Sequence, residues 1–308
     1  MPINQLWFQL LICILAGLGA GLGTGFAGLS AAVVISPMLT VLLGVDSYIA
    51  VGIALASDVL ASALSAVMYG VKKNIDIKNG LPLMFSVLAF TVLGSYIASL
   101  VPKSTMGLFS VFFTAILGVK FLIKPALGKS KRIESRSKAS QLAITLICGA
   151  FIGFFCGFVG AGGGMMMLLA LTSILGYDLK KAVGTSVFIM SFTALFGATM
   201  HFVIAQTLPP MNLLLPCILS TLLFSVIGSL IANKVDNLVL NRITGGILVV
   251  LGVFLITIDI MQMAGVIKNE GDVEAVFNSL SYAKMKIASY KPVFFSSDLP
   301  LFRLAVLS

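Results

Sequence analysis

The chain has 308 residues, of which 59% are hydrophobic and 10% are charged, and its formal net charge is +9 at pH 7. Soluble domains carry about 25% charged residues because their surface must be solvated, so this composition excludes an ordinary soluble enzyme or binding domain. The positive charge does not indicate a nucleic-acid partner, because the basic residues lie in short loops between apolar segments, where membrane orientation places them.

Apolar segments follow one another along the chain, and most approach the length of about 20 residues that crosses a bilayer. The first half has segments at residues 6–25, 30–43, 49–69, 81–100 and 107–123. The second half has segments at residues 141–159, 165–175, 182–205, 213–232 and 238–263. Two of them, 30–43 and 165–175, are too short to cross comfortably, and each follows a glycine-rich break. We expect these two to be tilted short helices or halves of re-entrant hairpins.

These segments predict an all-α polytopic membrane protein built from two transmembrane repeats of about five helical segments each. We expect the first repeat at residues 1–124, a basic cytoplasmic linker at 125–139 and the second repeat at 140–264. Residues 265–308 are weakly apolar and have no clear period, so we expect a loosely ordered or amphipathic tail there.

The two halves share a glycine pattern at a constant spacing, which predicts an internal duplication. Gly21-x-x-x-Gly25-Phe26-x-Gly28 matches Gly153-x-x-x-Gly157-Phe158-x-Gly160, and Gly25 and Gly157 are 132 positions apart. The same offset relates Leu43-Gly44-x-Asp46 to Leu175-Gly176-x-Asp178, and we expect both aspartates to form turns or cap helices. After a two-residue insertion, Gly94-Ser95 matches Gly228-Ser229.

Basic residues alternate between matched loops, and this predicts the orientation of the repeats. The loop after segment 49–69 carries Lys72, Lys73 and Lys78, whereas its counterpart after segment 182–205 is uncharged. The loop after segment 30–43 has no basic residue, whereas its counterpart has Lys180 and Lys181. Because basic loops stay in the cytoplasm, matched loops fall on opposite faces and the repeats are inverted. We then expect a multi-pass protein of the inner or plasma membrane with an external N-terminus.

Inverted repeats with broken helices are typical of secondary transporters, which bind their substrate near the membrane midplane. Gly160-Ala161-Gly162-Gly163-Gly164 precedes the short segment 165–175, and Gly28-Leu29-Ser30 is its counterpart. Free N–H groups at such a break, near a helix N-terminus, bind anions. Close helix packing explains the small residues of the first-half copy equally well.

Two hydroxyls and one carboxylate complete the predicted site. Thr185 and Ser186 stand near the start of segment 182–205, where they either donate to an oxyanion or bond back to their own helix. Asp58 is the only acidic residue clearly deep in a segment, where a carboxylate is costly and usually functional. It either couples transport to a proton or cation, or is a neutral side chain bonded within the bundle. His201 and its counterpart Tyr69 are expected to be an interfacial aromatic pair rather than a proton relay.

No cofactor or metal is expected, and no enzyme motif is found. The sequence lacks GxSxG, HExxH and Walker A patterns, and its four cysteines have no CxxC spacing. With a single histidine and a single deep carboxylate, the chain is poorly supplied for general acid–base catalysis.

The chain resembles the TauE/SafE family of sulfite and sulfoacetate exporters over roughly residues 17–258. The resemblance lies in Gly157-Phe158-x-Gly160-x-Gly162-Gly163-Gly164, in Ala182-x-Gly184-Thr185-Ser186 and in the duplicated layout. The first half departs from the family pattern, with Leu29-Ser30-Ala31 in place of further glycines and Ile53-Ala54 in place of Thr-Ser. The resemblance implies export of a small sulfur oxyanion or organosulfonate, driven by an ion gradient.

We therefore predict a secondary transporter that exports a small anion such as sulfite or a sulfonate. The predicted binding residues are Gly28, Ser30, Gly162, Gly163, Gly164, Thr185 and Ser186, and Asp58 is the predicted coupling residue for protons or another ion. Two alternatives remain at this stage, a passive anion channel on the same fold and a membrane-embedded partner subunit without transport of its own. The expected partners are the anion, the coupling ion and the lipid bilayer, with no nucleic acid, and the sequence allows a homodimer.

Overall fold

The computed structural model describes residues 3–101, 138–160, 163–177 and 179–232, with isolated helical residues between 116 and 123 and between 239 and 261. All of them belong to the first of two compact units, Met1–Ile267. The second unit, Lys268–Ser308, which contains most of the predicted tail, lies outside the described residues. So do Gly162, Asp178, the linker up to residue 137 and most of the predicted segments 107–123 and 238–263.

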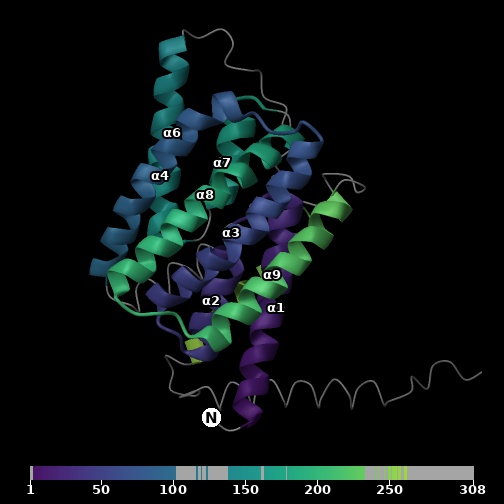
Figure 1. Cartoon of the computed structure of the whole chain (residues 1–308), viewed down its shortest axis with the longest axis vertical. Coiled ribbons are helices and arrows are strands. Elements are labelled where there is room, and N and C mark those ends of the chain that lie inside the picture. Colours follow the sequence, from purple (N-terminus) through teal and green to yellow (C-terminus); the bar gives the residue numbers. More distant parts are fainter. Residues whose placement is uncertain are drawn as a thin grey trace, which may run out of the picture. The chain divides into compact units, whose positions relative to one another are not determined.

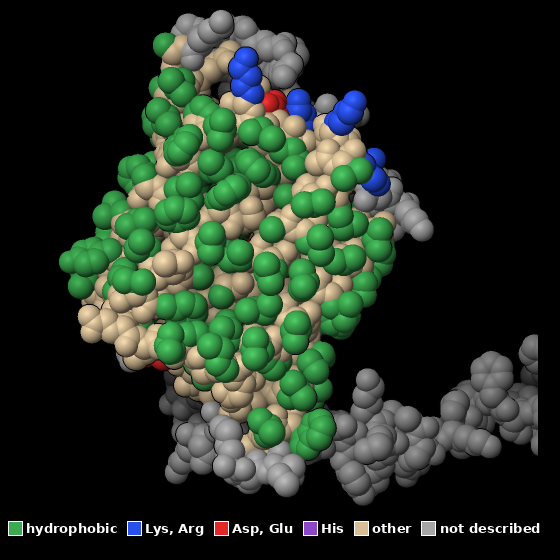
Figure 2. Space-filling view, viewed as in Figure 1, with side chains coloured by type: hydrophobic (Ala, Val, Ile, Leu, Met, Phe, Trp, Pro, Cys, Tyr) green, Lys and Arg blue, Asp and Glu red, His purple; other side chains and the backbone are tan. Residues whose placement is uncertain are grey.

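The described ranges contain helices and no strand, which confirms the all-α polytopic class. The elements are α1 (Ile3–Ala27), α2 (Ala32–Leu43), α3 (Ser47–Val71), α4 (Ile77–Leu100), α6 (Lys138–Val159), α7 (Gly163–Leu169), the π-helical turn η2 (Ala170–Ile174), α8 (Leu179–Ala205) and α9 (Met211–Ala232) (Figure 1). Within these ranges, six helices are long and apolar enough to cross a membrane. Figure 2 shows many apolar side chains over the visible face of the bundle, as expected of a surface that contacts lipid.

The two short segments form short helices, as their length predicts. At a rise of about 1.5 Å per residue, α2 is about 18 Å long, which is less than the hydrocarbon thickness of about 30 Å. All of its residues except Thr40 are buried. It ends at Gly44, whose φ of +60° gives the left-handed cap that glycine adopts easily. The Asp46 side chain then accepts hydrogen bonds from the Tyr48 and Ile49 N–H groups, which confirms its predicted capping role.

Glycines let the helices of one half approach those of the other. On α1, a methyl group added at Gly25 would collide with the Ser225 carbonyl oxygen of α9. On α6, a methyl group at the matched Gly157 would collide with the Thr91 carbonyl oxygen of α4. The glycine pattern of the sequence therefore marks two contacts of main chain against main chain.

The two sequence halves are interlocked rather than separate. α1 packs mainly on α9 and α6 packs on α4, so each half places its first helix against the fourth segment of the other half. α3 and α8, which are also matched in sequence, pack against each other. Gly28 and Gly160 share a positive φ, at +63° and +69°, and so do Gly44 and Gly176, at +60° and +70°. Matched positions thus share backbone conformation as well as sequence.

Alanine at Gly157 is expected to destabilise the protein, because the added methyl group has no room beside Thr91. Overpacking of this kind costs about 1–3 kcal/mol, and more where the obstacle is main chain. Thermal unfolding of the purified protein in detergent measures the loss. Gly246→Ala is the control, since no described atom lies within 4 Å of the added carbon. Equal unfolding temperatures for the two variants would contradict this packing account.

Candidate functional site

The first glycine-rich break, residues 28–31, meets the described ends of the second, Gly160 and Gly163–Gly164, inside the bundle. The Ser30 hydroxyl donates a hydrogen bond to the Gly160 carbonyl oxygen at 3.2 Å, and Ser30 is buried. A methyl group at Gly164 would collide with the Gly28 carbonyl oxygen and would lie 2.9 Å from the Ser30 nitrogen. The predicted residues Gly28, Ser30, Gly163 and Gly164 are therefore brought together at the start of α2 and α7.

The two predicted hydroxyl residues near the start of α8, Thr185 and Ser186, face different parts of the protein. A Cβ on Gly28 would lie 2.7 Å from the Ser186 Oγ, so Ser186 adjoins the first break. Its hydroxyl donates to the Val183 carbonyl oxygen at 2.9 Å, which is the back-bonding alternative for such a residue. Thr185 instead faces the α3–α4 connection, where its hydroxyl oxygen accepts a hydrogen bond from the Asp76 N–H at 3.0 Å.

Asp58 lies in the middle of α3 and is fully buried. The Ser62 hydroxyl, one helical turn later, donates to its Oδ1 at 2.7 Å. Its Oδ2 has no hydrogen-bond partner among the described residues. The hydroxyls of Thr24 and Ser30 and the Ala31 N–H interact electrostatically with this carboxyl group. Asp58 therefore faces the end of α1 and the first break.

Thr24 and Ser62 are site residues that the sequence reasoning missed. Ser62 follows Asp58 by four positions, which places both on one face of a helix, and that spacing was the available signal. Thr24 is the counterpart of Cys156 in the second half. Its hydroxyl donates to the Ala20 carbonyl oxygen at 3.0 Å, which is a bond within α1. Nothing in the sequence around Thr24 indicates a nearby carboxylate.

The equivalent place in the second half carries sulfur instead of oxygen. A Cβ on Gly163 would lie 2.9 Å from the Cys156 Sγ and 3.5 Å from the Met190 Sδ. Cys156 and Met190 stand 132 positions after Thr24 and Asp58. One half of the site is therefore polar and charged, and the other half is apolar and polarisable.

Tyr69 and His201, which are matched in sequence, make equivalent contacts with main-chain carbonyl oxygens. The Tyr69 hydroxyl donates to the Gly25 carbonyl oxygen at 3.4 Å, and the His201 Nε2 lies 3.0 Å from the matched Gly157 carbonyl oxygen. The His201 Nδ1 lies 3.1 Å from the Tyr48 carbonyl oxygen. Both side chains are buried in the bundle, near the C-terminal ends of α3 and α8.

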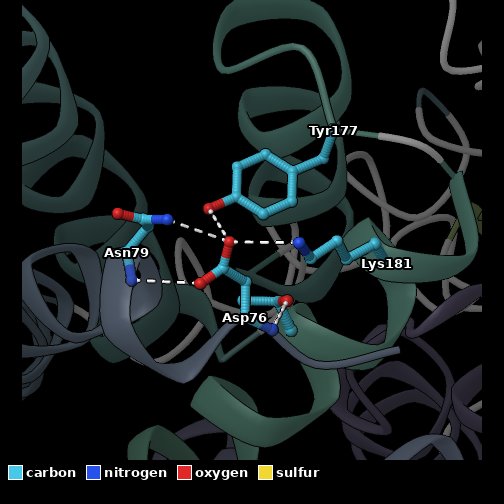
Figure 3. Close-up of polar contacts among 5 residues, drawn as sticks. Asp76, Asn79, Tyr177 and Lys181 are labelled. Atoms are coloured by element: carbon cyan, nitrogen blue, oxygen red, sulfur yellow. Dashed lines mark hydrogen bonds and ion pairs between the residues drawn. The ribbon is translucent and has the colours of Figure 1, made fainter. Parts of the chain in front are cut away.

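A polar cluster that the sequence reasoning also missed joins the two halves at one end of the bundle (Figure 3). The Asp76 Oδ2 lies 3.3 Å from the Lys181 Nζ, accepts from the Asn79 Nδ2 at 3.0 Å and accepts from the Tyr177 hydroxyl at 3.3 Å. Asp76 also caps α4 by accepting from the Asn79 N–H at 3.2 Å. Asp76 and Lys181 are far apart in the sequence, so only the fold reveals this contact.

The charge of Asp76 is stabilised in the folded protein. Partial burial is the largest single influence and raises its pKa, but the two hydrogen bonds from Asn79 and the nearby Lys181 ammonium together outweigh it. The pKa of Asp76 is therefore lower than usual. The carboxylate is the form that holds the α3–α4 connection to α8.

Replacing Asp76 by asparagine keeps a capping oxygen for Asn79 but removes the charge that Lys181 faces. A lowered folded-state pKa contributes stability above the ordinary Asp pKa of about 3.9, and that stability is lost as pH falls through the lowered value. We expect the wild type to unfold at a higher temperature than Asp76→Asn at about pH 7, and the gap to close below about pH 4. Thermal unfolding in detergent across this range is the measurement, and a gap that does not change with pH would contradict the ion pair.

Comparisons with known proteins agree with this architecture. A family model described as the sulfite exporter TauE/SafE matches residues 13–255. The probable membrane transporter protein YunE of Bacillus subtilis is 25% identical over 212 residues, which are 62% of this chain and 78% of that protein. A probable membrane transporter protein of Haemophilus influenzae is 31% identical over 140 residues, which are 44% of this chain and 52% of that protein.

A third relative, the probable membrane transporter protein ORF9 of Sinorhizobium, is 25% identical over 203 residues, which are 65% of this chain and 76% of that protein. No solved structure matches the chain. Because the family model covers most of the chain, and these relatives are transporters by name, the protein belongs to the TauE/SafE family of membrane transporters.

Proposed function

We propose that the protein is a secondary transporter that exports a small anion, such as sulfite or a sulfonate, coupled to an ion gradient through Asp58. The observation that carries the proposal is the meeting of two broken helices beside a fully buried carboxylate. Transporters place their substrate where discontinuous helices meet, because the free main-chain groups there replace water.

The first break offers donors to an anion. The N–H group of Ser30 makes no main-chain hydrogen bond among the described residues, and the neighbouring Ala31 N–H interacts with the Asp58 carboxyl group. They precede α2, whose N-terminal end carries a partial positive charge. Glycines 28, 163 and 164 leave the main chain without side chains that would cover these donors. Ser186 adjoins the same break from α8.

Asp58 supplies a reason for coupling. A buried carboxylate without a countercharge costs several kcal/mol and repels an anion nearby. Within the described ranges, no cationic side chain pairs with Asp58, so its charge is neutralised by a proton or cation from solution. Neutralisation raises the affinity for the anion, and by linkage the anion raises the affinity for that ion. Because the ion and the anion then move together, an inward ion gradient opposes export, and net export occurs when the outward anion gradient and the membrane potential together exceed it.

We propose that the repeats are inverted, which suits alternating access. α1 of the first half packs on α9 of the second, and α6 of the second half packs on α4 of the first. Two equivalent halves with opposite orientations would make this reciprocal pair of contacts. In Figure 1, α1 begins near the marked N-terminus at the lower edge, and α6 begins at the upper edge. Lysines gather at the upper edge in Figure 2, where α3 ends and α8 begins, and we assign this end to the cytoplasm.

Transport by Asp58→Asn is expected to lose its dependence on an ion gradient. Purified protein in proteoliposomes is tested for uptake of radiolabelled sulfite under imposed pH or sodium gradients. We expect the wild type to accumulate sulfite above equilibrium with one of these gradients and Asp58→Asn only to equilibrate it. Asp46→Asn is the control, because asparagine also caps a helix and Asp46 is a capping residue.

Three other outcomes would each overturn one part of the proposal. If wild-type sulfite flux only equilibrates under every gradient, the protein is a passive channel and the coupling role is wrong. If no sulfite or sulfonate flux occurs, the proposed substrate is wrong. If Asp58→Asn accumulates sulfite as well as the wild type does, coupling resides elsewhere in the chain.

A further inference from the structure

We infer that Asp58, Ser62, Thr24 and Ser30 form a binding site for one sodium ion, placed beside the anion site at the first break. The inference rests on the proposed function, because it names the coupling ion. It is carried by three buried hydroxyls, those of Thr24, Ser30 and Ser62, that interact with the Asp58 carboxyl group, whose Oδ2 has no hydrogen-bond partner among the described residues.

The four side chains come from separate parts of the first half and are all buried. Thr24 lies in the last turn of α1, Ser30 lies in the break, and Asp58 and Ser62 lie on successive turns of α3. Each is at most 1% exposed. A hydroxyl-rich shell around a buried carboxylate is the oxygen environment that a hard cation prefers.

Each hydroxyl of the cluster has a hydrogen-bond acceptor other than the Asp58 Oδ2. Thr24 donates its hydrogen to the Ala20 carbonyl oxygen at 3.0 Å, and Ser30 donates its hydrogen to the Gly160 carbonyl oxygen at 3.2 Å. The Ser62 hydrogen goes to the other carboxylate oxygen, Oδ1, at 2.7 Å. Each hydroxyl has one hydrogen and two lone pairs, so the Thr24 oxygen keeps lone pairs for a cation near Asp58, and the Ser30 oxygen keeps one besides the one that accepts the Ala32 N–H at 3.3 Å. The Ala31 N–H also interacts with the carboxyl group, and no cationic side chain does so among the described residues.

A buried carboxylate without a countercharge is stabilised by one positive ion. A proton would satisfy one pair of oxygens, whereas a sodium ion contacts the carboxylate and several hydroxyls at once. The C-terminal end of α1 adds the negative end of a helix dipole at the same place. In other transporters, main-chain carbonyls and helix C-termini at such breaks hold sodium. A single carboxylate matches a monovalent ion better than a divalent one.

The second half cannot hold a second ion of this kind. The residues 132 positions after Thr24, Ser30, Asp58 and Ser62 are Cys156, Gly162, Met190 and Ala194. None of these four side chains carries oxygen, and sulfur ligands suit soft metals rather than sodium. The stoichiometry is therefore one sodium ion per chain.

The test is equilibrium binding of radioactive sodium to the purified full chain in detergent, without any anion substrate. We expect saturable binding of one ion per chain, lost in Asp58→Asn and weakened roughly 10- to 100-fold in Ser62→Ala. Asp46→Asn, outside the cluster, is expected to bind like the wild type. Size-exclusion profiles are compared for all variants, and Ser62→Ala serves if Asp58→Asn does not fold.

Absence of saturable sodium binding by the folded wild type would overturn the inference, and so would binding that Asp58→Asn and Ser62→Ala leave unchanged. The proposed function fails separately. Accumulation of sulfite under a pH gradient without sodium binding would keep the transporter and make the coupling ion a proton. Sodium binding without any sulfite or sulfonate flux would keep the site and remove the proposed substrate.

Discussion

Close approach of main chain to main chain at glycine is the interaction on which the rest of the structure depends. Gly25 and Gly157 let α1 reach α9 and let α6 reach α4, where any side chain would collide with a carbonyl oxygen. The breaks at Gly28 and Gly160 come directly after these contacts. The packing of α1 and α6 therefore places both breaks inside the bundle. A break at membrane depth is tolerable only where its polar groups find partners or line a cavity. Here Ser30 bonds the Gly160 carbonyl oxygen, so each break supports the other.

The two halves share a backbone but divide the chemistry between them. Matched glycines with positive φ and matched helix contacts give two similar half-sites. The first half-site carries the carboxylate of Asp58 with hydroxyls, whereas the second carries the sulfur atoms of Cys156 and Met190. A backbone with two equivalent halves suits a protein that alternates between two states. A single charged half-site suits the binding of one coupling ion in each cycle.

Features set by local pattern could be predicted from the sequence. The lengths of α2 and α7, the capping by Asp46 and the burial of Asp58 each depend on residues within one segment or turn. The glycine pairs were visible because a duplication repeats them at a fixed spacing.

Features set by tertiary contact could not be predicted. The sequence did not reveal that α1 and α6 pack on helices of the opposite half. Thr185 was expected beside the anion, but its oxygen accepts the Asp76 N–H, and no sequence signal links residues so far apart. Burial of His201 follows from its contact with the Gly157 carbonyl oxygen, which a position near a helix end does not reveal.

In the proposed transport cycle, the meeting point of the two breaks is reached from both sides of the membrane in turn. Cys156 is a native reporter there, since it is buried beside Gly163. In a variant with Cys13, Cys148 and Cys217 replaced by alanine, membrane-impermeant thiol reagents are applied to oriented vesicles from either face. We expect Cys156 to be labelled from both faces, and a short alkanesulfonate to slow both reactions. Labelling from one face alone, or from neither, would rule out alternating access at this point of the bundle.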